Sequence, residues 1–186
     1  MKINEKINQL LLELLTNLPA PRSSALTASS DQLIKTAALK AAAVSGALSL
    51  PAGALAILTL LPDLVAVWKI QAQLVADIAA QSGKSNQLTR ETLLYCLFGQ
   101  EAMANEDLVV RIGQRFVVRR SSQKMFESFL GKLGLRIGRS LVGDRVARWI
   151  PFVGAAVIAR YSFNDTAKVG NTARELFGAE IEIKEK

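Results

Sequence analysis

The sequence predicts an all-α protein, a compact multi-helix bundle whose central helical hairpins are rich in Ala and Gly. Three observations carry this prediction. Apolar residues recur at spacings of three and four along most of the chain, as they do on one face of a helix. Alternation of apolar and polar residues over the length of a strand is scarce. Residue types that favour helix, such as Ala, Leu, Gln, Lys and Arg, are abundant.

Composition excludes several kinds of enzyme site. The chain has 186 residues, half of them hydrophobic, which is enough for one domain with a sizeable core. It contains no His and a single Cys, Cys96. A Ser-His-Asp triad, a Cys-His pair, a His-ligated zinc and an internal disulfide are therefore impossible within the chain. We expect a protein without cofactor, metal or catalytic residues, and Cys96 as a small core residue.

The N-terminal 30 residues predict an amphipathic helix and a linker. The helix spans about residues 4–18, and Pro19 and Pro21 stop it. Its apolar stripe consists of Ile7, Leu11, Leu14, Leu15 and Leu18. A linker that contains Ser and Thr follows, to residue 30. We therefore divide the chain into this segment (1–30), a helical domain (31–180) and a short tail (181–186).

The helical domain begins with a capping signal. Ser29 or Ser30 caps the second helix, and Asp31 complements the positive end of the helix. The 22 residues from 41 to 62 then carry no charge, and their mean hydropathy is near the threshold for a transmembrane helix. Pro51 interrupts this run and small residues dominate it. Two interpretations fit: a helical hairpin buried in a soluble core, or a re-entrant element that dips into a membrane.

Two further helices follow the uncharged run. Pro62 fits the first position of a helix, and Gly83 is a plausible C-terminal stop. Thr89 opens the next helix, which runs to about Met103. Near its end lie Glu101, Glu106 and Asp107, which we interpret as solvated carboxylates at a helix junction.

The whole excess of positive charge lies in one segment. The net charge is +7, and residues 111–148 hold ten basic and two acidic residues, whereas the rest of the chain is nearly neutral. Its helix places an apolar stripe beside a basic face, as in interfacial helices, although an ordinary core-packed helix fits as well. The candidate residues for binding a lipid or a partner are Arg111, Arg115, Arg119, Arg120, Lys124, Lys132, Arg136, Arg139, Arg145, Arg148, Phe126, Phe129 and Trp149.

The C-terminal region predicts a helix from Pro151 to about Tyr161 and a second helix that ends near Phe177. A face of small residues in the first of these could pack closely against the region around Gly46 and Gly53. This face consists of Gly154, Ala155, Ala156 and Ala159. The last residues alternate between apolar and charged types, which is compatible with a short strand or a frayed end.

Nucleotide and nucleic-acid motifs are missing. The chain has no Walker A loop and no G-x-G-x-x-G after a strand. Aromatic residues make up 6% of the chain and scarcely interleave with the basic cluster, so we regard nucleic acid as an improbable partner.

Three blocks of the sequence together resemble the EcsC family of bacterial proteins. The first is the Leu-Pro that opens LPDLVAVWKIQAQLVADIAAQSG, residues 61–83. The second is ETLLYCLFG, residues 91–99, and the third is RWIPFVGAAVIARYSFNDTAKVGNTARELF, residues 148–177. The sequence departs from the family pattern at Lys69, where an Arg is common, and at 159–161, where an Asn is common. The resemblance implies a helical, membrane-associated bacterial protein of unassigned biochemical function, and no catalytic residues.

These observations favour a non-enzymatic, membrane-associated binding protein. Its basic segment, 111–148, would bind anionic lipid or an acidic partner. The alternative is a soluble protein–protein interaction module, such as an adaptor or immunity-type protein, and a lipid-modifying enzyme is less favoured. Glu5 and Glu13 interrupt the apolar start of the chain, so a secretory signal is not expected. We predict a cytoplasmic protein at the periphery of the inner membrane.

Overall fold

The computed structural model of the chain describes residues 3–48, 56–102, 108–143 and 151–184, and every structural statement below concerns that part. It is mostly helical, as predicted, with one small sheet. In chain order the elements are α1 (Ile3–Thr16), the short 3₁₀ helix η1 (Ser23–Leu26), α2 (Ser30–Leu48), α3 (Ala56–Gln81), η2 (Ser85–Gln87), α4 (Arg90–Ala102), β1 (Val109–Ile112), β2 (Arg115–Arg119), α5 (Gln123–Gly143), α6 (Pro151–Gly178) and β3 (Glu180–Lys184).

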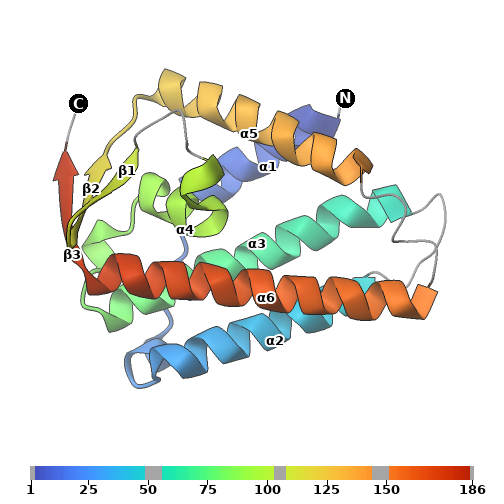
Figure 1. The fold of residues 1–186 in the computed structure, drawn as a ribbon, viewed down its shortest axis with the longest axis horizontal. Helices are drawn as coiled ribbons and strands as arrows, with labels where there is room; N and C mark the ends of the chain where they lie inside the picture. Colours follow the sequence, from blue (N-terminus) through green and yellow to red (C-terminus); the bar gives the residue numbers. More distant parts are fainter. Residues whose placement is uncertain (1–2, 49–55, 103–107, 144–150, 185–186) are drawn as a thin grey trace.

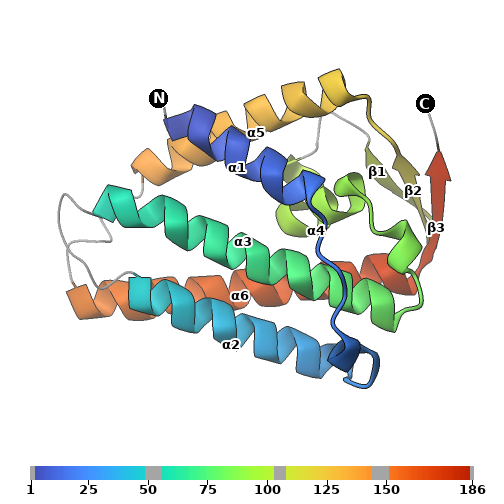
Figure 2. The ribbon, with the colours of Figure 1, turned by 180° about the vertical axis from the view of Figure 1, so that it is seen from behind.

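The helices form two groups with a small sheet at one end. Helices α2, α3 and α6 pack against one another in one group (Figure 1). Helices α1 and α5 pack together on the other side of α3, with α4 between α5 and the first group (Figures 1 and 2). The sheet lies at the end of the molecule where α6 finishes, far from the beginning of α6 (Figure 1).

The sheet joins two distant parts of the chain. Strands β1 and β2 form an antiparallel hairpin, and β3 pairs with β2 in parallel, so β2 is central. Ile112 pairs with Arg115 across a two-residue turn. The first residue of this turn, Gly113, has φ 64°. This is the glycine position of a type II′ turn. The sequence was compatible with either a short strand or a frayed end for the last residues. Residues Glu180–Lys184 form a strand, β3.

Helix caps appear where the sequence places them. Before α2, the Ser29 hydroxyl accepts from the Gln32 amide at 3.2 Å, and the Gln32 side chain accepts from the Ser29 amide at 3.0 Å. Before α4, Thr89 and Thr92 make the same reciprocal pair of bonds. Both are capping boxes, which satisfy amides that the first helical turn leaves unpaired.

The stop at Gly83 is also confirmed. Its φ is 68°, in the left-handed region that glycine adopts without cost. The Lys84 amide donates to the Ala79 carbonyl at 2.8 Å, and the Gly83 amide donates to the Ala80 carbonyl at 2.9 Å. This pair of bonds is a Schellman motif, which ends α3.

Two predicted boundaries are wrong. Helix α3 begins at Ala56, six residues before Pro62, so Pro62 lies inside the helix and does not start it. A proline costs the helix one hydrogen bond, and tertiary packing can override this local signal. The two helices predicted after Pro151 are one continuous helix, α6. None of the glycines of α6 has a positive φ, and no proline follows Pro151. Asn164 and Asp165 are tolerated inside a packed helix.

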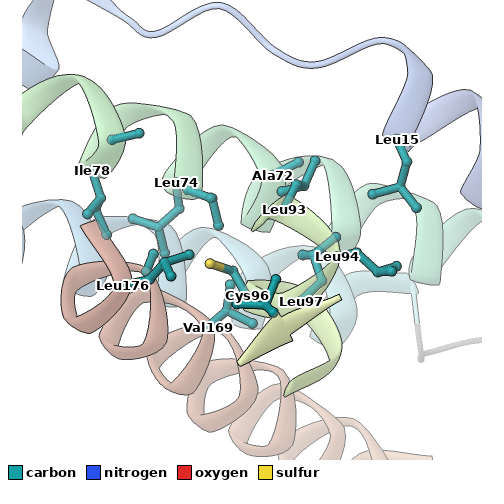
Figure 3. Close-up of a cluster of buried hydrophobic side chains, with 14 of the residues drawn as sticks. Leu15, Ala72, Leu74, Ile78, Leu93, Leu94, Cys96, Leu97, Val169 and Leu176 are labelled. Carbon is teal, nitrogen blue, oxygen red and sulfur yellow. The ribbon is translucent and has the colours of Figure 1, made fainter. Parts of the chain in front are cut away.

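The core fills the space between the two groups of helices. In α1 the predicted stripe is buried at Ile7, Leu11 and Leu15. Leu74 and Ile78 of α3, Leu93, Leu94, Cys96 and Leu97 of α4, and Val169 and Leu176 of α6 meet in one cluster (Figure 3). Cys96 is therefore a core residue, as expected. Residues 49–55, including Pro51 and Gly53, lie outside the described residues.

Small residues bring α2 and α6 close together. A Cβ built on Gly46 would lie 3.5 Å from the Cβ of Ala159, so the predicted contact between these two small-residue faces is confirmed at this pair. Further along, a Cβ on Gly170 would lie 2.6 Å from Ile34 Cγ1 and 3.0 Å from Leu74 Cδ2. Gly170 thus lets α6 approach α2 and α3 at once.

Candidate functional site

Six of the predicted basic residues lie exposed along three consecutive elements. We call this set the basic surface: Arg111 of β1, Arg115 and Arg119 of β2, Arg120 after it, and Lys124 and Lys132 of α5. The same stretch, residues 111–135, contains one acidic residue, Glu127. The hairpin leads directly into α5 (Figure 1), so the basic surface continues from the sheet onto that helix.

Part of this charge is compensated. Arg111 forms an ion pair with Glu175 of α6, and its guanidinium carbon lies 5.7 Å from the centre of the Phe116 ring. Arg115 lies 3.6 Å from Glu182 of β3. The side chains of Arg111, Glu175 and Arg115 are each about half exposed, and that of Glu182 is 39% exposed. Exposed ion pairs contribute only about 0–1 kcal/mol to stability. In such a pair the arginine can exchange its glutamate for another anion.

The sheet adds a basic residue that sequence reasoning missed. In the parallel register of β2 and β3, Arg119 stands opposite Lys184. Like charges in paired positions on one face of a sheet destabilise it unless anions neutralise them. Lys184 also lies 3.4 Å from Glu182. No local signal could have placed Lys184 here, because the pairing joins strands that α5 and α6 separate in the sequence.

The two aromatic candidates of α5 are corrected. Phe126 is 1% exposed and Phe129 is 3% exposed, so both rings belong to the core and neither can face a membrane. They share the buried face of α5 with Leu130 and Leu133, and this face packs on α1. The amphipathic pattern here was that of an ordinary core-packed helix. Arg136 and Arg139 lie in α5, but their side chains are not described, and Arg145, Arg148 and Trp149 lie outside the described residues.

A buried carboxylate fixes the hairpin to the helices. Glu91 of α4 is 2% exposed and accepts hydrogen bonds from the amide and the hydroxyl of Ser121, at 3.1 and 2.8 Å. Arg90 lies 3.0 Å from the same carboxylate oxygen. Burial alone would raise the pKa of Glu91, but the bonds from Ser121 and Arg90 outweigh it, and the pKa lies below its ordinary value.

Arg90 also connects α4 to the beginning of α5. Its guanidinium donates to the Ser121 carbonyl and to the Gln123 side chain, the latter at 2.8 Å. Its guanidinium carbon also lies 4.3 Å from the centre of the Phe126 ring, in cation–π geometry. The hairpin and α5, which together carry the basic surface, are therefore held in a fixed relation to α4.

A groove of about 370 Å³ lies between α1 and α3. Its lining is mostly apolar and includes Leu10, Leu14 and Trp68, together with Glu13 and Lys69. The volume is near the lower end of the range for small-molecule sites. The opposite charges of Glu13 and Lys69 give the groove no net charge, unlike the basic surface.

The described residues contain no cluster of carboxylates and thiols that could hold a metal. Burial raises the pKa of the Cys96 thiol, which disfavours its nucleophilic thiolate form. The side chains of Glu101, Glu106 and Asp107 are not among those described. Within the described ranges, none of the helices combines the length and the apolar character that crossing a membrane requires.

The fold and the basic surface define the class: a mostly helical protein with one small mixed sheet and an exposed cationic surface. In comparisons with known proteins, no family model, no curated protein and no solved structure matches the chain. The resemblance to the EcsC family therefore stays a prediction.

Proposed function

We propose that the protein is a non-enzymatic helical binding protein that attaches to an anionic membrane surface through the basic surface. The observation that carries the proposal is the charge balance of residues 111–135. Six basic side chains and one acidic side chain occupy this stretch, and all seven are exposed. Each Lys or Arg near an anionic lipid surface contributes about 1 kcal/mol, so a few contacts give salt-sensitive binding.

Two further features support lipid as the anion. The basic surface is spread over a sheet and a helix, which suits an extended plane of phosphates. Helix α5 also runs from the sheet towards the end of the molecule where α3 and α6 begin (Figures 1 and 2), and the first turns of these two helices, residues 56–62 and 151–159, carry no charge. An acidic protein partner is the alternative, in which the same residues would form the rim of an interface.

The experiment is flotation with vesicles. Purified protein is mixed with phosphatidylcholine vesicles or with vesicles that also contain phosphatidylglycerol, at low and high salt. We expect flotation with the anionic vesicles, stronger at low salt because salt screens exposed charges. The variant Lys124→Glu/Lys132→Glu should float at least tenfold less at low salt.

A matched control separates the basic surface from net charge. The variant Lys35→Glu/Lys168→Glu makes the same charge change at exposed positions of α2 and α6. It should float like the wild type. Equal loss in both variants would mean that net charge alone drives binding. Absence of flotation by the wild type under all conditions would overturn the proposal and favour an acidic protein partner.

A further inference from the structure

Strand β3 forms one edge of the sheet, at the outer end of the molecule. The strand order is β1-β2-β3, so among the described strands β3 has a neighbour on one side only. Both views place it outermost, with β2 between it and β1 (Figures 1 and 2). An edge strand presents a row of unpaired amides and carbonyls, which is a template for a further strand.

The ladder with β2 shows which main-chain groups lie at this edge. The Arg120 amide donates to the Lys184 carbonyl at 3.0 Å, so the main chain of Lys184 points towards β2. Both main-chain groups of a strand residue point to the same side, and the side alternates along the strand. The amides and carbonyls of Ile181 and Ile183 therefore point away from β2, out of the sheet.

The side chains of β3 divide between the two faces of the sheet. Ile181 and Ile183 lie on the face that packs against the core. Glu180, Glu182 and Lys184 alternate with them and therefore lie on the opposite face. On that face the strand is acidic at its beginning and basic at its end.

This pattern is complementary to itself when two copies of β3 run antiparallel and are centred on Glu182. Glu180 of each copy then lies opposite Lys184 of the other copy. Ile181 lies opposite Ile183 of the other copy, and their outward main-chain groups form a hydrogen-bonded pair. Glu182 faces Glu182 of the other copy in a non-hydrogen-bonded pair.

The two central carboxylates have cations close by. Glu182 lies 3.4 Å from Lys184 and 3.6 Å from Arg115 of its own chain. Each copy therefore brings two cations to its central carboxylate, and these offset the repulsion between the two glutamates.

The charges beside β3 also favour a second copy as the partner. Arg119 of β2 stands opposite Lys184, and like charges in paired positions destabilise a sheet. Glu180 is exposed, and no residue of the described ranges forms an ion pair with it. The antiparallel pairing brings Glu180 of one copy to Lys184 of the other. It thereby adds an anion beside the two cations.

The other edge of the sheet offers no such match. Strand β1 carries one charged side chain, Arg111, which forms an ion pair with Glu175 of α6. Two copies of β1 would therefore bring together basic side chains only. The charge pattern distinguishes β3 as the edge that recognises a second copy.

We infer that two copies of this chain associate through antiparallel pairing of their β3 strands, which joins their sheets into one continuous sheet. This inference goes beyond the proposed function and does not require lipid. Each copy contributes a strand of five residues, Glu180–Lys184. An interface of this size belongs to the weak, transient class, so we expect a reversible dimer.

Engineered cysteines test both the contact and its register. Cys96 is 3% exposed, so Glu182→Cys presents one accessible thiol. Opposite residues of a non-hydrogen-bonded pair have Cα atoms about 4.5 Å apart, which a disulfide can bridge. Glutathione disulfide should therefore convert this variant to a covalent dimer. In the control, Glu180→Cys, the two cysteines would lie about 14 Å apart along the strands, so the covalent dimer should form at least tenfold more slowly.

Charge exchange tests the pairing without a covalent link. In sedimentation velocity, the average mass of the wild type should rise from monomer towards dimer as protein concentration increases. Lys184→Glu places like charges opposite each other and should weaken association about tenfold. Glu180→Lys/Lys184→Glu restores opposite charges and should restore association. Lys168→Glu makes the same charge change as Lys184→Glu at an exposed position of α6, and it should associate like the wild type.

The inference is wrong if the wild type stays monomeric at every concentration and the two cysteine variants oxidise at equal rates. The charges of β3 would then protect its edge from pairing. A dimer that Glu182→Cys does not link, or that Lys184→Glu does not weaken, would overturn it as well. Circular dichroism checks that the variants are folded. Because no vesicles are present, the result is independent of the flotation experiment.

Discussion

Glu91 of α4 accepts hydrogen bonds from both the amide and the hydroxyl of Ser121, which lies between β2 and α5. These two residues connect the hairpin to the helical core across 30 positions of sequence. Because Glu91 is buried, its charge is tolerated only through these bonds and through Arg90. The stability of the surface that carries the basic residues therefore depends on one ionised carboxylate.

We expect this carboxylate to make stability depend on pH. The pKa of Glu91 is lower in the folded protein than its ordinary value of 4.5. Its contribution is therefore complete above pH 4.5 and is lost as pH falls through the lower, folded-state pKa. Glu91→Gln should cost about 1.5–3 kcal/mol at pH 7, the range for hydrogen bonds to charged groups. Urea unfolding from pH 7 to pH 3 measures the difference, which should shrink below pH 4.5.

Glu13→Gln, at an exposed position, is the control and should change little. A difference that is constant with pH would show that the charge of Glu91 does not matter.

Gly170 should not tolerate a methyl group. Its Cβ would meet Ile34 and Leu74 at 3.0 Å or less, so Gly170→Ala should destabilise the protein by about 1–3 kcal/mol through overpacking. Gly131, in α5, has no neighbour within 4 Å of such a Cβ. Gly131→Ala should instead stabilise the protein by up to about 1 kcal/mol through helix propensity. Thermal unfolding compares the two, and a gain in both would contradict the close approach of α6 to α2 and α3.

Two Arg–Asp pairs of similar geometry should differ widely in their importance. The Asp77 side chain is fully buried and accepts from the Arg22 amide and Nε, each at 2.8 Å. Arg22→Ala would leave this carboxylate without its cation, at a cost of about 2–4 kcal/mol. Arg174→Ala removes the partner of Asp31, whose side chain is 84% exposed, and should cost less than about 1 kcal/mol.

A double variant checks the reason for that difference. In an Asp77→Asn background, Arg22→Ala should cost much less, because no buried charge is left unpaired. Urea unfolding of the four proteins gives the coupling. An unchanged cost would mean that Arg22 acts through its packing alone.

Cys96 should be unreactive in the folded protein. It is buried among Leu93, Leu97 and Val169 (Figure 3), and burial raises the pKa of its thiol. A thiol reagent such as dithionitrobenzoate should react with it at the rate of unfolding in water and rapidly in denaturant. Fast reaction under native conditions would contradict this burial.

Local chemistry made much of the helical fold predictable. The caps at Ser29 and Thr89 and the stop at Gly83 depend on side-chain oxygens and on glycine within a few residues, and sequence carries such signals directly. The contact of Gly46 with Ala159 also followed from their small size.

The hairpin was not predicted because its strands lack a clear alternation. Phe116, Val117 and Val118 are all buried, since β2 is the central strand, and three consecutive apolar residues carry no period of two. Gly113 followed by Gln114, between two runs rich in Val and Ile, was the usable signal for a two-residue turn. Phe126 and Phe129 were misassigned because an amphipathic helix has the same pattern whether its apolar face meets a core or a membrane.

The parallel pairing of β2 with β3 has a consequence for biosynthesis. Partner residues such as Phe116 and Ile181 are 65 positions apart, with α5 and α6 between them. At ribosomal rates of about 5–20 residues per second, β2 emerges several seconds before the strand that completes its ladder. Throughout that interval its open edge offers unpaired amides and carbonyls to any neighbouring nascent chain. The hairpin is therefore the part of the molecule where a chaperone would matter most.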